Sequence, residues 1–263
     1  MYGIARLPIA TAPPILWPGR HQLGAYSTQA KDLVGWWPTV GQSGTNLTDY
    51  AGSNNLTGTN SPTLASDADL GQVAEFAYAS AQYYSAAISA PSLPLTLTCW
   101  FNFGGTTQQS VGFGLTTSFS SGITSGSGYY LEAYDNASTQ YIIANQRNTA
   151  SSRTAYSSEV AAGDWHFFAG VFASNSSRLA YTDGVLTDTS TASASTVTCD
   201  RILIGGMTSS TALDGKIADC RWYNAALTAS QIAEIYLRPF DLYQLLGPAA
   251  TSKIPFGLFR RVI

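Results

Sequence analysis

Residues 95–103 alternate between two kinds of side chain, and this period of two constrains the fold more than any other feature of the sequence. The apolar set is Leu95, Leu97, Cys99, Phe101 and Phe103, and the residues between them are Thr96, Thr98, Trp100 and Asn102. Successive side chains of a β-strand point to opposite faces of its sheet. The pattern therefore predicts a strand that buries one face in a core.

Further segments point to the same class of fold. Residues 165–172 form a continuous apolar run, which is typical of a strand with neighbours on both sides. Residues 178–189 carry Asp183-Gly184 between two β-rich halves, and this pair suits the positive φ angles of a two-residue hairpin turn. Gly-, Ser- and Thr-rich loops such as 119–128 separate the strands. Since 263 residues suffice for one sandwich, we predict an all-β antiparallel sandwich.

One short helix is predicted at residues 229–236, after the last strand. Thr228 is a good N-cap, and Gln231 three residues later completes a capping box. Pro239 ends the helix, because proline disfavours helical geometry in the residue before it. A single appended helix leaves the all-β class unchanged.

Charge divides the chain into three parts. Residues 1–31 have three basic groups and no acid, and residues 238–263 have four basic groups and one acid, so each end carries +3. The whole chain carries −3, which leaves −9 on the residues between. We therefore predict an N-terminal arm at 1–32, a body at 33–237 and a C-terminal arm at 238–263.

Both predicted arms are too apolar for solvated tails. Candidate assembly residues are Ile15, Trp17, Phe240, Tyr243, Phe256 and Phe259. A contiguous exposed patch of such side chains would promote aggregation, so it should be buried. The arms are expected either to fold back over their own body or, as the charge division favours, to reach a neighbouring subunit.

Four segments, in this order, resemble the laminin-G-like jelly rolls of the concanavalin A-like lectin/glucanase superfamily. They are residues 33–38 (LVGWWP) with the Asp-, Asn- and Gly-rich loop 49–58, residues 95–103 (LTLTCWFNF), residues 163–184, and residues 213–232. The resemblance covers residues 33–237. It implies a two-sheet jelly roll, in agreement with the periodicity.

The stretch after the helix resembles another group of proteins. Residues 235–243 (IYLRPFDLY) are similar to tails that follow such domains in proteins encoded by tailed bacteriophages. This resemblance implies a structural subunit of a virion, such as a head decoration protein, a head fibre or a tail component.

Catalytic motifs are missing from the sequence. Glycosidases need two carboxylates about 5–10 Å apart, and the Glu-x-Asp-x-x-Glu spacing of hydrolases with this fold does not occur. The sequence also has no Gly-x-Ser-x-Gly elbow and no Gly-Lys-Ser/Thr phosphate loop. His166 lies in an apolar strand, where a structural imidazole is expected. We therefore expect a protein that is not an enzyme.

A calcium site is the only cofactor that the residues suggest. Asp49 and Asn54 offer oxygen ligands of the kind that calcium prefers. In similar family members this loop approaches an aspartate of the closing strand, here Asp219. The alternative is an Asx turn, in which these side chains accept hydrogen bonds from nearby backbone amides without a metal.

Sugar binding would use exposed aromatic rings. Neighbouring residues of a strand face opposite ways, so each aromatic doublet places one ring outside. The candidates are Tyr84, Tyr130 and Trp222, from the doublets at 83–84, 129–130 and 222–223. The alternative is that these rings form the core on one side and an interface on the other.

Other features limit the partners and the location. The balance of 13 basic and 16 acidic residues argues against nucleic acid as a partner. No apolar run is long enough for a membrane span, and no signal peptide is recognisable, so we expect synthesis in the host cytoplasm and a place in the virion. Cys99, Cys199 and Cys220 match no metal-binding spacing and are expected to be reduced, with a Cys199–Cys220 bridge as the alternative.

Two functions of different classes follow. The first is a non-enzymatic structural protein of a phage particle, attached through its arms to other virion proteins or to copies of itself. The alternative is a carbohydrate-binding module for adhesion to host glycans. The two functions do not exclude each other, because a particle protein can also bind glycans.

Overall fold

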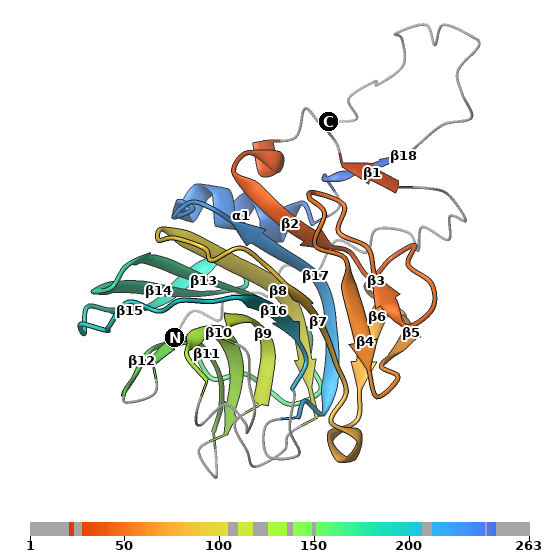
Figure 1. Cartoon of the computed structure of the whole chain (residues 1–263), viewed down its shortest axis with the longest axis horizontal. Helices are drawn as coiled ribbons and strands as arrows, with labels where there is room; N and C mark the ends of the chain where they lie inside the picture. Colours follow the sequence, from red (N-terminus) through yellow and green to blue (C-terminus); the bar gives the residue numbers. More distant parts are fainter. Residues whose placement is uncertain are drawn as a thin grey trace, which may run out of the picture.

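Two antiparallel β-sheets lie face to face and form the body of the protein, as the sequence predicts (Figure 1). The computed structural model describes residues 21–23, 28–104, 110–117, 126–135, 139–148, 151–206, 212–239 and 241–245. Within these residues, no helix has the length and the apolar character needed to cross a membrane.

The first sheet has eight strands. Their spatial order is β12 (Ser151–Tyr156), β11 (Gln140–Asn148), β10 (Gly128–Asp135), β9 (Ser110–Thr116), β16 (Arg201–Ile204), β7 (Tyr83–Ala87), β4 (Leu56–Thr59) and β3 (Asn46–Leu47). Strands β9 and β16 are neighbours although six strands separate them in sequence, so the chain crosses between the sheets in the manner of a jelly roll.

The second sheet contains the strand that the alternating pattern predicts. Its order is β15 (Val185–Ser190), β14 (Ser177–Thr182), β13 (His166–Ser174), β8 (Leu95–Phe103), β17 (Gly215–Tyr223), β6 (Gly71–Phe76) and β5 (Thr63–Asp67), and β2 (Leu33–Trp37) pairs with β17. The predicted hairpin turn joins β14 to β15, with φ angles of 51° at Asp183 and 79° at Gly184.

Strand β8 shows how the sequence pattern becomes two layers of core. Its five alternating apolar residues, from Leu95 to Phe103, all lie in the core between the sheets. Trp100, which points the other way, packs on the outer face of the second sheet with Phe167 and Ile232. Removal of this apolar surface from water is the main force that holds the sheets together.

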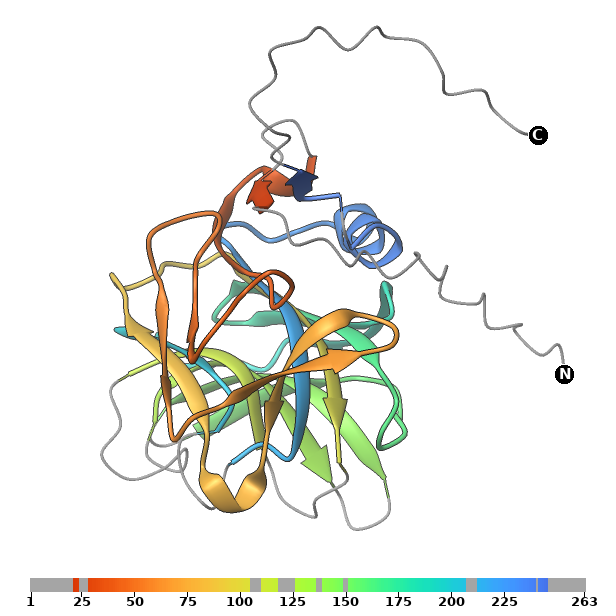
Figure 2. The ribbon, with the colours of Figure 1, turned by 90° about the vertical axis from the view of Figure 1, so that its right-hand side faces the viewer.

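The helix α1 (Ala229–Leu237) covers that outer face of the second sheet (Figure 2). The predicted capping box is present: the Gln231 amide nitrogen donates to Thr228 Oγ1 at 3.3 Å, and the Thr228 amide nitrogen donates to Gln231 Oε1 at 2.9 Å. Ile232 and Ile235 are the buried residues of the helix. The helix adds a third layer at one side of the sandwich.

Parts of both predicted arms belong to the folded body. A short strand β1 (His21–Leu23) pairs with β18 (Tyr243–Leu245), and 3₁₀ turns lie at η1 (Thr28–Ala30) and η2 (Tyr78–Ser80). Gln29 and Leu242 are buried. Of the predicted assembly residues, Ile15, Trp17, Phe240, Phe256 and Phe259 lie outside the described residues, and Tyr243 is placed only as backbone in β18.

All three cysteines are free and buried, so the alternative of a Cys199–Cys220 bridge does not hold. The Cys199 thiol donates to the Leu115 carbonyl oxygen at 3.2 Å, and burial raises its pKa to about 12. Burial also raises the pKa of the Cys220 thiol. A thiol with a raised pKa forms little of the reactive thiolate. The cysteines therefore serve as core residues.

Candidate functional site

The outer face of the first sheet carries aromatic and polar side chains over β10, β11 and β12 (Figure 1, green strands). Residues opposite each other in antiparallel strands share a face. The pairs on this face are Tyr134–Tyr141, Glu132–Ile143, Tyr130–Asn145, Ile143–Tyr156, Asn145–Thr154 and Arg147–Ser152. The intervening residues Leu131, Ala144 and Ala155 point into the core between the sheets. The register therefore brings six pairs to one face of the sheet, on which Tyr130, Glu132, Ile143 and Asn145 are buried.

Three tyrosines form a cluster at one end of this face. The Tyr156 ring lies 5.9 Å from the Tyr141 ring and 6.4 Å from the Tyr134 ring, with interplanar angles of 83° and 74°. Such edge-to-face contacts are favourable for aromatic rings. Tyr156 is 40% exposed. The cluster thus holds one ring in place while part of it stays in contact with solvent.

A row of hydrogen-bonded side chains runs beside the cluster. Asn145 Nδ2 donates to Glu132 Oε2 at 2.9 Å, and Ser152 Oγ donates to Asn145 Oδ1 at 2.7 Å. Glu132 and Asn145 are fully buried, whereas Ser152 is exposed. The buried carboxylate orients the amide, and the amide orients the hydroxyl at the surface. This row presents polar groups in a defined geometry, as small-molecule sites require.

The prediction that the rings of Tyr84, Tyr130 and Trp222 are exposed for sugar binding is wrong. Tyr84 and Trp222 lie in the core between the sheets, and Tyr130 is fully buried on the outer face, where its hydroxyl lies 2.6 Å from Thr116 Oγ1. Burial raises the pKa of Tyr84 to about 12. None of these three rings is accessible to a sugar.

Tyr134, Tyr141 and Tyr156 are not among the rings predicted from the sequence. None of the three has an aromatic neighbour in sequence, so each lacks the adjacent ring that drew attention to the doublets. Their positions on the outer-facing register of β10, β11 and β12 are the only signal that identifies them. That register depends on pairing between strands.

The Asp49 carboxylate organises the loop after β2. Its Oδ1 accepts hydrogen bonds from the amide nitrogens of Trp36, Ala51 and Gly52, each at 3.0 Å. Its Oδ2 accepts from the amide nitrogen of Asn54 at 3.0 Å. Asn54 thus contributes its backbone rather than a ligand oxygen to Asp49. This is the Asx-turn alternative.

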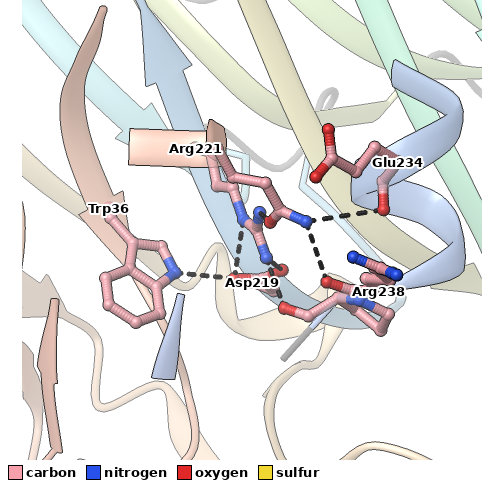
Figure 3. A network of polar contacts seen from close by, with 7 residues as sticks. Trp36, Asp219, Arg221, Glu234 and Arg238 are labelled. Carbon is pink, nitrogen blue, oxygen red and sulfur yellow. Dashed lines mark hydrogen bonds and ion pairs between the residues drawn. The ribbon is translucent and has the colours of Figure 1, made fainter. Parts of the chain in front are cut away.

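Asp219 faces a different set of donors, because β17 contains a bulge at this point (Figure 3). Its φ of 52° lies in the left-handed region, which aspartate tolerates better than most residues. Asp219 Oδ1 accepts from Trp36 Nε1 at 2.7 Å and from Arg221 Nε at 3.1 Å. Asp219 Oδ2 accepts from Arg221 Nη2 at 2.5 Å. The aspartate is therefore one half of a buried ion pair.

Arg221 joins one residue from each predicted arm, Gln29 and Pro239, to the second sheet. It is fully buried, and it donates to Gln29 Oε1 at 2.6 Å and to the Pro239 carbonyl at 2.5 Å. Gln29 Nε2 in turn donates to the Arg238 carbonyl at 3.0 Å (Figure 3). Burial by itself would lower the pKa of Arg221, but the neighbouring Asp219 carboxylate holds it above its ordinary value. We call Asp219, Arg221, Gln29 and Pro239 the buried latch.

The predicted calcium ligands do not fit a calcium site. The Asp49 oxygens accept four backbone N–H groups, and Asp219 is paired with a guanidinium whose charge repels a cation. In the part of the chain that the structure describes, no group of three His, Cys, Asp or Glu side chains is placed to hold a metal ion. The role of both aspartates is structural.

Calcium chelation provides a test. We expect the melting temperature to stay unchanged on addition of EGTA or of millimolar calcium, because a ligand that bound only the folded state would raise it. Differential scanning fluorimetry over a calcium series measures this. A melting temperature that climbs with calcium concentration and falls back with EGTA would reveal a metal site.

Solved structures with a similar fold include two well-known proteins. The sialidase of Trypanosoma rangeli in complex with the inhibitor DANA superposes with a TM-score of 0.58 and 13% identity, over 80% of this chain and 33% of the sialidase. Botulinum neurotoxin type C gives a TM-score of 0.58 and 11% identity, over 79% of this chain and 51% of the toxin chain. At these identities the likeness shows the fold alone.

The chain is shorter than these proteins and spans about a third of the length of the sialidases. A sequence search of curated proteins found no match. A family model does match: residues 77–233 fit the Laminin_G_3 model, described as the concanavalin A-like lectin/glucanases superfamily. The match covers strands of both sheets and most of α1. Because it extends over more than half of the chain, the protein belongs to this laminin-G-like family of the concanavalin A-like lectin/glucanase superfamily.

Proposed function

We propose that the protein binds a glycan on the outer face of the first sheet and does not convert it chemically. The observation that carries this proposal is the partly exposed Tyr156 ring, held edge-on by Tyr134 and Tyr141 beside a row of fixed polar groups. The similar sialidase structures include one in complex with sialic acid. The similar toxin structure concerns an interaction with two ganglioside molecules.

The face has the two elements that sugar recognition needs. In a glycan of two or more sugars, one pyranose ring stacks its C–H face on the exposed part of Tyr156. Hydroxyls of the next sugar exchange hydrogen bonds with Ser152, four residues away on β12, about 13 Å along the strand. Ring and hydroxyl are both held by their neighbours in the absence of ligand, so less conformational entropy is lost on binding. Glu132 acts here through Asn145, as an orienting group.

Replacement of Tyr156 tests the proposal. We expect Tyr156→Ala to weaken glycan binding about tenfold or more, which is about 1.4 kcal/mol, because the stacking surface is lost. Tyr156→Phe keeps the ring and should retain binding. A glycan array with the full chain identifies the ligand, and isothermal titration calorimetry then compares the variants.

The matched control is Tyr84→Phe, which changes a buried tyrosine between the sheets and should leave the affinity unchanged. Circular dichroism confirms that each variant keeps its β-structure. The proposal fails if no glycan binds on the array, or if Tyr156→Ala binds the identified glycan as tightly as the unaltered chain.

We also propose a structural place for the protein in a phage particle, attached through its chain ends. The observation that favours it is the pairing of β1 with β18, which brings residues 21–23 and 243–245 of two basic, apolar ends to one location. The neighbourhood of the gene is the simplest test. Genes for a capsid, portal or terminase protein beside it would support this role, and a neighbourhood without virion genes would oppose it.

A further inference from the structure

Two arginines lie beside Ser152, at the end of β12 opposite to Tyr156. Arg147 faces Ser152 in the register of β11 and β12, so the two side chains share the outer face of the first sheet. Arg153 follows Ser152 in sequence, and its Nη1 donates to the Ser152 carbonyl oxygen at 2.9 Å. Both arginines are half-buried, so each keeps some contact with solvent. A ligand group at the Ser152 hydroxyl would therefore meet two positive charges.

A third arginine, Arg178 of β14, lies behind this end of β12. Its side chain is fully buried and donates from Nη2 to the carbonyl oxygen of Ala192. Arg153 Nε donates to the next carbonyl along the chain, that of Ser193, at 2.9 Å. Because their acceptors belong to consecutive residues, the two guanidiniums lie close together. Burial, together with the positive charge of Arg153, lowers the pKa of Arg178.

The charges of Arg153 and Arg178 are not neutralised by carboxylates. Among the residues that the structure describes, neither of these arginines forms an ion pair. The acceptors around Arg178 are neutral oxygens, such as Gln146 Oε1 at 2.9 Å and the Asn175 carbonyl at 3.1 Å. Neutral acceptors satisfy the N–H donors but leave the net charge, whose field is strong where water is partly excluded. This end of the outer face therefore attracts an anion.

The other end of the outer face carries carboxyl groups instead. Glu132 lies in the same cross-strand row as Ile143 and Tyr156. Asp188 Oδ2 accepts a hydrogen bond from the Tyr156 amide nitrogen at 3.0 Å. In contrast, three of the six basic residues between positions 33 and 237 lie at the Ser152 end. The charge of the face therefore changes along β12, from carboxyl groups at Tyr156 to guanidinium groups at Ser152.

We propose that the glycan carries an anionic substituent, a carboxylate or a sulfate, on the sugar that lies at Ser152, and that the sugar at Tyr156 is uncharged. This inference rests on the glycan-binding function proposed for the same face. Arg147 and Arg153 donate charge-assisted hydrogen bonds to the anion, which are stronger than those between neutral groups. Arg178 is buried and acts through its charge without touching the ligand.

A glycan array that presents each backbone in a neutral, a carboxylated and a sulfated form tests the proposal with the full chain. We expect an anionic form to bind about tenfold more tightly than its neutral counterpart in isothermal titration calorimetry at 50 mM NaCl. This preference should shrink severalfold at 500 mM NaCl, because salt screens charges in contact with solvent. The carboxylated and sulfated forms distinguish the two possible anions.

Arg147→Gln should weaken binding of the preferred anionic form about tenfold and leave binding of the neutral form unchanged. Tyr156→Ala should weaken both forms equally, because it removes the stacking surface and no charge. The matched control is Lys216→Gln, which removes one positive charge from the second sheet and should alter neither affinity. Circular dichroism checks the fold of each variant. Arg153→Gln takes the place of Arg147→Gln if the latter loses its β-structure.

The outcomes separate this inference from the glycan proposal itself. Equal binding of the neutral and anionic forms, or an arginine variant that keeps the preference for the anion, would overturn the inference and leave the glycan proposal standing. Absence of binding by every form on the array would overturn both. A preference for the anion that the arginine variant loses and Lys216→Gln keeps supports the inference.

Discussion

Arg221→Met is expected to lower the free energy of unfolding by about 3–5 kcal/mol, because removal of one partner leaves the other half of a buried ion pair uncompensated. Asp219 would keep a carboxylate at 7% exposure without its guanidinium. Gln29 and the Pro239 carbonyl would also lose their donor. Urea unfolding monitored by tryptophan fluorescence measures the change.

Two further variants make this prediction specific to the buried latch. Asp219→Ala/Arg221→Met removes both charges and should cost less than the sum of the two single substitutions, since no unpaired charge remains. Arg238→Met breaks an ion pair whose arginine is 65% exposed and should cost at most about 1 kcal/mol. If Arg221→Met stays within about 0.5 kcal/mol of the unaltered chain, the buried latch does not stabilise the fold.

Asp49→Ala is expected to lower the free energy of unfolding by about 2–4 kcal/mol. The substitution leaves four backbone N–H groups without their acceptor, and an unsatisfied buried group costs about 1–3 kcal/mol, which water entry partly relieves. The amide of Trp36 is the most costly of them, because this residue is fully buried. The same urea experiment gives the value.

Asp49→Asn separates the hydrogen bonds from the charge. An amide oxygen in place of Oδ1 can still accept from Trp36, Ala51 and Gly52, and only the bond from Asn54 is lost. This variant should cost about half as much as Asp49→Ala. Equal costs for the two would mean that the negative charge, rather than the turn, is what the loop requires.

Local signals in the sequence were sufficient for most of the fold. The alternation at 95–103 corresponds to β8, the Asp183-Gly184 pair forms the β14–β15 turn, and Thr228 with Gln231 caps α1. Each of these features depends on residues within about ten positions of one another. Backbone periodicity, positive φ and helix capping act over that range, so a single sequence can reveal them.

The site could not be predicted in the same way. Trp222 was predicted to face outward, but the bulge at Asp219 adds one residue to β17, so that Cys220 and Trp222 point into the core and Arg221 points out. Both Ala218 and Asp219 lie on the outer side of this bulge. A simple period of two cannot reveal where a strand takes an extra residue, because the partners β2 and β8 impose it.

The sequence by itself determined the all-β class, the central strand, the turn and the capped helix, since these follow from backbone geometry and near neighbours. Only the tertiary structure decided which rings meet the solvent and which charges are buried. Tyr134 and Tyr156 meet through the register of three strands, and Arg221 meets Gln29 across 192 positions of sequence. The physical reason is that strand register and burial are properties of pairing between distant segments, which the order of residues along one strand does not contain.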